Sequence, residues 1–269
     1  MIVWLNGDLI DGAAARIDPA DRGFTLGDGL FETIRARGGR ATLLDRHLRR
    51  LHEGAELLGI PVAWSDVEIA EAIERLLGTV GLADAAVRLT LTRGPAPRGV
   101  LPPGQPTPTV LITAGTMPPP ARPAHAVVAT GTRRNELSPL ARVKSLNFLD
   151  NVLARREAAA RGADEALLLN TRGRLAEATI GNLFLSIDGQ LVTPPVADGA
   201  LPGIMRGLLI ERCGAVERSL DLADLLVAEA GFISNALGLR PIATVDGRAI
   251  GGSVDRALQL VSDCRSTVE

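Results

Sequence analysis

The stretch KSLNFLDNVLARREAAARGADEALLLN, residues 144–170, decides the fold. It opens on Lys144, continues through a helix-forming segment at 149–161, and ends in an apolar segment at 165–170 that predicts a buried strand. Elsewhere strands and helices alternate without a strict βαβ rhythm, and the turns favour antiparallel pairs. The pattern therefore predicts the fold class α/β (α+β), with two mixed domains.

Lys144 is the only lysine of a chain whose lysines and arginines together number 29. Such a bias places arginine wherever a surface cation suffices. Arginine cannot replace lysine where a neutral amine must attack a carbonyl group, because the guanidinium stays protonated. A lysine amine can be brought into its neutral form and can make an imine. The alternative is that this lysine survived by chance on a solvated face.

The first half of the chain contains two helix signals and one alternating strand. Leucines and alanine recur at helical spacing over 44–58, and a capping box of Ser65 with Glu68 opens a second helix. Residues 30–37 alternate as a strand, with Phe31, Thr33 and Arg35 on one face. That face either lines a polar pocket or belongs to an exposed edge strand.

The stretch TMPPPARP, residues 116–123, is too rich in proline for the interior of a helix or strand. It predicts the linker between two domains. We therefore expect an N-terminal α/β domain at 1–115, a proline-rich linker at 116–125, and a C-terminal α/β domain at 126–269 that carries Lys144.

Composition argues against several classes of function. The chain has 269 residues and a net charge of -2, which is not the footprint of a nucleic-acid-binding protein. No apolar run approaches the roughly 20 residues that span a bilayer, and the start lacks signal-peptide character. We therefore expect a cytoplasmic protein without a membrane partner. The two cysteines and three histidines lack metal-ligand spacing, so no metal is predicted.

Four further features can hold a phosphorylated aldehyde. Glu177 is a candidate carboxylate for a pyridine nitrogen, and Arg50 is a candidate phosphate clamp. Pro202-Gly203 opens a helix whose free backbone N–H groups can bind an anion, and Ser234-Asn235 stands at the end of a predicted strand and offers further donors. Each feature also has an ordinary structural explanation, and spacing alone does not assemble them.

The motifs GDGLFETIR, HLRRL, LAEATIGNLF, LPGIMR and SNALGLRPI, together with the stretch quoted first, resemble the class IV aminotransferase superfamily in content and order. The resemblance covers nearly the whole chain. It implies a fold type IV enzyme with pyridoxal 5'-phosphate held between two mixed α/β domains, and a homodimer. It also implies a small-molecule amino substrate that bears a carboxylate.

Carried over by position, the resemblance makes Lys144 the catalytic residue and the Schiff-base lysine. Glu177 matches the carboxylate that pairs with the pyridine nitrogen, and Arg50 matches the phosphate-binding arginine. The remaining cofactor-binding positions are a residue that packs on the ring, two backbone donors to the phosphate, and a donor at a strand end: Leu201, Ile204, Met205 and Asn235.

The resemblance leaves the reaction open, and the substrate positions Phe31, Arg35 and Arg98 discriminate between branches. D-amino-acid and branched-chain transaminases typically place a tyrosine at the position of Phe31, and this chain has no tyrosine. The stretch RGPAPRG, residues 93–99, resembles the D-amino-acid branch, which usually has a histidine two positions after the arginine that corresponds to Arg98. This chain has Val100 at that position. These departures favour 4-amino-4-deoxychorismate lyase, which yields 4-aminobenzoate and pyruvate for folate biosynthesis.

Two alternatives remain open at this point. One is a class IV aminotransferase, of D-amino-acid or branched-chain type, with an atypical carboxylate pocket. The other is a catalytically idle relative that binds pyridoxal phosphate. The intact combination of Lys144, Glu177 and Arg50 argues against the idle relative.

Overall fold

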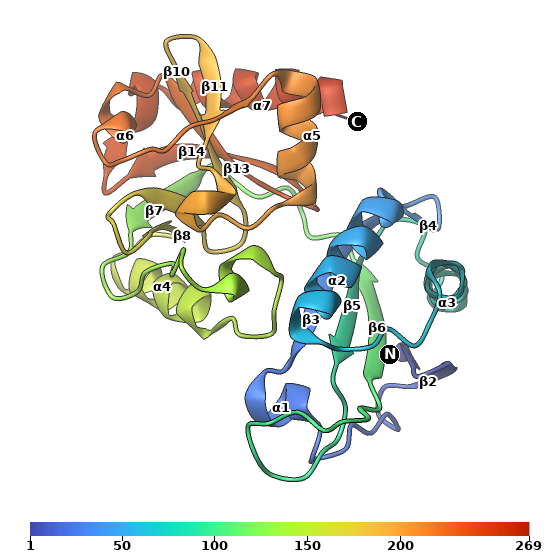
Figure 1. Cartoon of the computed structure of the whole chain (residues 1–269). Coiled ribbons are helices and arrows are strands. Elements are labelled where there is room, and N and C mark those ends of the chain that lie inside the picture. Colours follow the sequence, from blue (N-terminus) through green and yellow to red (C-terminus); the bar gives the residue numbers. More distant parts are fainter. Residues whose placement is uncertain (269) are drawn as a thin grey trace. The chain divides into compact units, whose positions relative to one another are not determined.

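The alternating stretch around Phe31 forms β3, which lies between β5 and β4 in the sheet of the first structural unit. The computed structural model describes residues 1–268. Among these, six strands of the first unit form an antiparallel sheet in the order β2-β1-β6-β5-β3-β4 (Figure 1). Their bounds are β1 Ile2–Leu5, β2 Asp8–Asp11, β3 Gly29–Arg37, β4 Arg40–Ala41, β5 Ala85–Thr92 and β6 Thr109–Thr116.

Both predicted helices of this unit are confirmed, as α2 (Leu44–Leu58) and α3 (Asp66–Val80), and a short α1 spans Arg22–Leu26. Gly59 ends α2 with a φ of 64°, a conformation that favours glycine. The capping box at the start of α3 is present. Ile34 of β3 is fully buried in one core cluster with Leu48 of α2 and Ile73 of α3. The even-numbered residues of β3 therefore face the helices, and Phe31 and Thr33 lie on the opposite face.

The second unit contains a mixed sheet of nine described strands. Eight follow the order β12-β11-β10-β13-β14-β7-β8-β9, and β15 pairs with β14. The pairs β11–β12, β14–β7 and β7–β8 are parallel, and the others are antiparallel. The bounds are β7 Ala124–Val128, β8 Glu165–Leu169, β9 Leu175–Ala178, β10 Asn182–Ile187, β11 Gln190–Thr193, β12 Val216–Glu217, β13 Ala230–Asn235, β14 Gly238–Val245 and β15 Arg248–Ala249.

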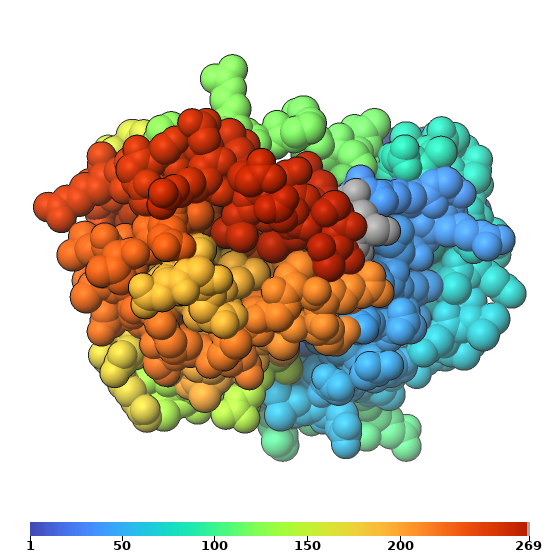
Figure 2. All heavy atoms as spheres, turned by 90° about the horizontal axis from the view of Figure 1, so that it is seen from above, coloured from blue at the N-terminus to red at the C-terminus, as the bar shows by residue number. Residues whose placement is uncertain are grey.

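Helices pack on this second sheet and on one another. α4 contacts β8, and α7 contacts β13, β14 and α5; Figure 2 shows α7 in red beside α5 in orange. Cys213 at the end of α5 lies against Cys264 of α7, and burial together with that neighbour raises the pKa of the Cys264 thiol to about 12. The helical bounds are α4 Leu149–Ala160, α5 Ile204–Cys213, α6 Asp224–Val227 and α7 Val254–Val268, with short 3-10 turns at Pro139–Arg142, Val196–Asp198 and Ile250–Gly252.

The segment that carries Lys144 belongs to the first unit and not to the C-terminal domain that the sequence predicted for it. The first unit comprises Met1–Pro119 and Val143–Asn147, and the second comprises Pro120–Arg142 and the chain from Phe148 onward. The physical reason is strand pairing, because Phe31 N–H donates to Lys144 O at 2.9 Å and Leu146 N–H donates to Gly29 O at 2.9 Å. The expectation that Lys144 lies within the C-terminal domain is therefore wrong.

The proline-rich stretch is also shorter than the expected linker at 116–125. β6 continues to Thr116, and β7 already begins at Ala124. Within the described part of the chain, no helix is long and apolar enough to cross a membrane.

Candidate active site

Lys144 lies against Phe31 in the first unit. Its backbone oxygen accepts the Phe31 N–H, and its Nζ atom is 4.3 Å from the centroid of the Phe31 ring. The guanidinium carbon of Arg88 lies 3.9 Å from the same centroid. The only lysine and a fixed cation therefore share one aromatic ring.

Arg88 comes from β5, which pairs with β3 along its whole length. Thr33 stands opposite Arg88, and Phe31 stands opposite Thr90, so these side chains lie on one face of the sheet. Arg88 is exposed at the surface of the sheet, and its partial desolvation there lowers the pKa of the guanidinium. The sequence showed the alternation of this strand, but only its register against β3 brings Arg88 to Phe31.

The other two predicted substrate residues are placed differently. Arg35 is half-buried on the face of β3 that carries Phe31. Arg98 is exposed on the loop after β5. Arg22 holds that loop, because its Nη1 and Nη2 atoms donate to Gly99 O at 2.8 Å and Val100 O at 2.9 Å. The loop is therefore anchored immediately beyond Arg98.

Arg50 forms a buried ion pair that the sequence did not reveal. Its Nε atom donates to Glu32 Oε1 at 2.8 Å and its Nη2 atom to Glu32 Oε2 at 2.6 Å. His47 Nδ1 lies 2.7 Å from the same Oε2 atom. Burial would raise the pKa of Glu32, but hydrogen bonds from His47 and Arg50 outweigh it and hold that pKa below its usual value. Glu32 thus fixes the plane of the predicted phosphate-binding guanidinium.

Glu177 lies on β9 of the second unit and is nearly fully buried. The N–H of Leu201 donates to its Oε2 atom at 2.9 Å, and Nε of Arg134 lies 3.1 Å from its Oε1 atom. Leu201 is held in turn, since its carbonyl accepts from Asn182 Nδ2 at 2.8 Å. The structure therefore groups Glu177 with Leu201, and adds Arg134, which the sequence reading missed.

The start of α5 lies in the same unit and has no side-chain cap. Gly203 is its N-cap, and the helix begins at Ile204 and Met205. A Cβ atom at Gly203 would come within 2.1 Å of Asn182 Oδ1, so a larger residue would displace the Asn182 amide. The first N–H groups of a helix have no partner within the helix and attract anions.

The predicted donor Asn235 is used for the local fold, and its neighbour offers a better donor. Asn235 Nδ2 donates to Ile180 O at 3.3 Å, and Asn235 Oδ1 accepts the Leu237 N–H at 2.9 Å. The hydroxyl of Ser234 is fully buried and has no hydrogen-bond partner in the described structure. A buried hydroxyl without a partner is unusual and indicates a ligand or water contact.

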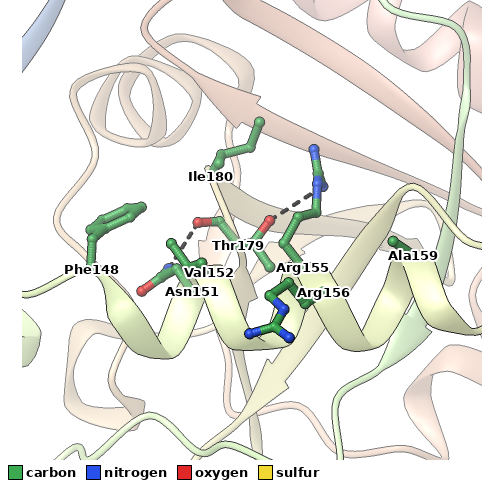
Figure 3. A pocket seen from close by; sticks show the side chains of 8 residues that line it. All are labelled: Phe148, Asn151, Val152, Arg155, Arg156, Ala159, Thr179 and Ile180. Carbon is green, nitrogen blue, oxygen red and sulfur yellow. Dashed lines mark hydrogen bonds between the residues drawn. The ribbon is translucent and has the colours of Figure 1, made fainter.

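A separate groove of about 330 Å³ lies along α4 (Figure 3). Its polar side chains serve the fold: Asn151 Nδ2 donates to Thr179 O, and Arg155 Nη1 contacts Thr179 Oγ1 and Glu165. The remaining lining residues are Phe148, Val152, Arg156, Ala159 and Ile180. The lining contains no lysine and no acidic residue. The described residues also contain no cluster of side chains suited to a metal ion.

Comparison with protein families gives a match over most of the chain. The model of the family described as Amino-transferase class IV matches residues 29–245. This range includes β3, α2, Lys144, β9 and the start of α5.

Three relatives show how the similarity is distributed. A protein of Methanocaldococcus jannaschii named "Putative branched-chain-amino-acid aminotransferase" is 36% identical, over 93% of this chain and 90% of its own length. The D-alanine aminotransferase of Bacillus licheniformis is 30% identical over 100% of both chains. The aminodeoxychorismate lyase of Bacillus subtilis is 30% identical over 97% of this chain and 93% of its own.

Solved structures of branched-chain aminotransferases are also similar to this chain over most of its length. The branched-chain amino acid aminotransferase of Escherichia coli is 28% identical, with a TM-score of 0.89 over 96% of this chain and 92% of that one. A second branched-chain amino acid aminotransferase, complexed with N-(5'-phosphopyridoxyl)-L-glutamate, is 25% identical, with a TM-score of 0.90 over 99% and 93%.

Proposed function

The chain belongs to the class IV aminotransferase family, and we propose that it transfers amino groups between amino acids and 2-oxo acids. It is a fold type IV enzyme that depends on pyridoxal 5'-phosphate. The relatives support an aminotransferase better than the lyase that the sequence favoured, because the branched-chain relative is 36% identical and the lyase 30%.

The residues of both units fit the cofactor. The uncapped start of α5 and the unpartnered Ser234 hydroxyl suit its phosphate, and the buried Glu177 suits a protonated ring nitrogen. Lys144 supplies the only lysine amine of the chain. When bound, the cofactor acts as an electron sink for the carbon that bears the substrate amine.

The protein groups have separate tasks in this proposal. Lys144 holds the cofactor through its amine and, once released, moves a proton at the substrate carbon. Glu177 and Arg50 orient the ring nitrogen and the phosphate. Arg88 attracts the distal carboxylate of a dicarboxylic substrate and Arg35 the carboxylate beside the amine, because a guanidinium binds carboxylates through paired hydrogen bonds.

The observation that carries the proposal is the shared contact on Phe31, which places Lys144 Nζ and the Arg88 guanidinium against one ring. A substrate whose amine meets Lys144 can therefore place a carboxylate at Arg88. This arrangement suits a dicarboxylic amino donor such as glutamate. One of the solved branched-chain relatives carries a glutamate adduct of the cofactor.

A second candidate is 4-amino-4-deoxychorismate lyase, supported by Phe31 in place of tyrosine and by the Bacillus subtilis relative. Its substrate also carries carboxylates that Arg88 and Arg35 can bind. The family resemblance further leads us to propose a homodimer, which light scattering of the purified protein tests.

One preparation tests both reactions. The protein is incubated with a panel of D- and L-amino acids, and the absorbance of the cofactor is recorded. Active donors should convert the cofactor to its amine form, and glutamate should be among them. If the protein releases 4-aminobenzoate and pyruvate from aminodeoxychorismate and converts no amino acid, the proposed aminotransferase function is wrong and the lyase function is correct.

A further inference from the structure

Arg134 has no role in the sequence analysis, yet its side chain lies at the carboxylate of Glu177. Its Nε atom is 3.1 Å from Glu177 Oε1, and the Arg134 side chain is only 16% exposed. The backbone of Arg134 is tied to the sheet, because its N–H donates to Leu169 O at 2.8 Å. The guanidinium is thus delivered from a segment attached to β8, whose antiparallel neighbour β9 carries Glu177.

The arrangement around Glu177 gives each carboxylate oxygen its own contact. Oε2 accepts the Leu201 N–H, and Oε1 faces Arg134. Leu201 supplies only a dipole, whereas Arg134 supplies a full positive charge. A carboxylate that is 6% exposed is costly to keep ionised without an opposite charge nearby, and arginine is protonated at every accessible pH.

We propose that Arg134 is a positioning residue that keeps Glu177 ionised and correctly oriented for the ring nitrogen of the cofactor. The inference rests on the proposed function, since it assigns Glu177 to that nitrogen. The guanidinium also lowers the affinity of the carboxylate for a proton. The proton shared between Glu177 and the ring therefore stays on the ring nitrogen.

A purely structural role is the competing explanation. Arg134 Nε also lies 3.2 Å from Gly199 O, and its Nη2 atom donates to Ala141 O at 3.1 Å. These bonds hold the loop before α5 and the turn at Pro139–Arg142. Loss of Arg134 can therefore disturb the site without any electrostatic effect on the cofactor, and the test must separate the two.

The separating experiment compares two ligands on the apoenzyme. One is pyridoxal 5'-phosphate, and the other is its deaza analogue, in which a C–H group replaces the ring nitrogen. Arg134→Met should weaken binding of pyridoxal phosphate about tenfold. Binding of the deaza analogue should change less than about twofold. Arg134→Lys retains the charge and should recover part of the affinity for pyridoxal phosphate.

Two further variants complete the design. Arg133→Met removes the neighbouring arginine, whose Nη1 atom donates to the nearby carbonyls of Ala129 and Thr132, and should change neither affinity. Glu177→Gln should also lower the affinity for pyridoxal phosphate and not the affinity for the deaza analogue. Adding Arg134→Met to Glu177→Gln should lower the affinity for pyridoxal phosphate little further, because both changes act on one interaction.

The proposal is overturned if Arg134→Met weakens the binding of both ligands equally, or weakens the binding of neither. If Arg134→Met does not fold, Arg134→Lys decides, with a ligand-selective loss supporting the proposal and an equal or absent loss contradicting it. Failure of the unmodified protein to bind either ligand would instead refute the proposed function.

Discussion

Each unit of the protein contains one of the two buried glutamate–arginine pairs described above, and the two pairs are built differently. Glu32 receives two hydrogen bonds from Arg50 and a contact from His47. Glu177 receives an ion-pair contact from Arg134 and a backbone N–H. In the first pair the arginine is the proposed ligand-binding group and the carboxylate supports it. In the second pair these roles are exchanged.

This difference predicts how strongly the substitution of one residue in each pair affects the stability of the protein. The Glu32 pair is bidentate and fully enclosed, so it contributes to the stability of the first unit as well as to the orientation of Arg50. In the second pair Arg134 Nε lies 3.1 Å from Glu177 Oε1, while Oε2 accepts a backbone N–H, so a charge and a dipole share the carboxylate. Substitutions that remove one charge from each pair test this contrast.

The largest expected effect is on Glu32. Glu32→Gln leaves Arg50 buried without this counter-charge, and losses of about 3–5 kcal/mol in the free energy of unfolding are typical of such changes. Chemical denaturation monitored by circular dichroism measures the loss. A loss below about 1 kcal/mol, as for an exposed pair, would contradict the enclosed bidentate geometry.

Glu177→Gln should destabilise the protein less, by about 1–3 kcal/mol, because Arg134 keeps its bonds to Gly199 O and Ala141 O. The same denaturation experiment compares both variants directly. Equal destabilisation by the two substitutions would remove the contrast between the pairs.

The stability contributed by Glu32 should depend on pH. Its pKa in the folded protein is below the usual value of 4.5, so the contribution is fully present above that value and is lost as the pH falls through the folded pKa. Melting temperatures of the native protein and of Glu32→Gln should therefore converge in acid. A difference that persists or widens as the pH falls would show the opposite sign.

The smallest effect is expected at Arg88, which lies on the sheet face and takes part in neither pair. Arg88→Met should raise KM for a dicarboxylic donor about tenfold, because it removes one charged contact. KM for alanine should stay nearly unchanged. A decrease in kcat for both donors with unchanged KM would place Arg88 in catalysis rather than in binding of the distal carboxylate.

The sequence predicted those elements whose signals are local. α2 follows from apolar spacing, the start of α3 from the capping box of Ser65 and Glu68, and α5 from Pro202-Gly203. The hairpin of β10 and β11 follows from Asp188-Gly189, whose positive φ angles match the expected turn.

The partners of the site residues required long-range pairing and were missed. Glu32 and Arg50 are 18 residues apart, and Arg134 meets Glu177 across the pairing of β8 with β9. Lys144 joins the first unit through hydrogen bonds to β3, more than a hundred residues earlier in the chain. No local pattern encodes such contacts, so neither the supporting charges nor the unit of Lys144 could be read from the sequence.

Chemical trapping of the cofactor on the protein tests the central claim most directly. The protein loaded with pyridoxal phosphate is reduced with borohydride, digested and analysed by mass spectrometry. We expect a single phosphopyridoxyl group, attached to the peptide that contains Lys144. An unmodified Lys144 peptide, or cofactor attached only at the amino terminus, would contradict the assignment.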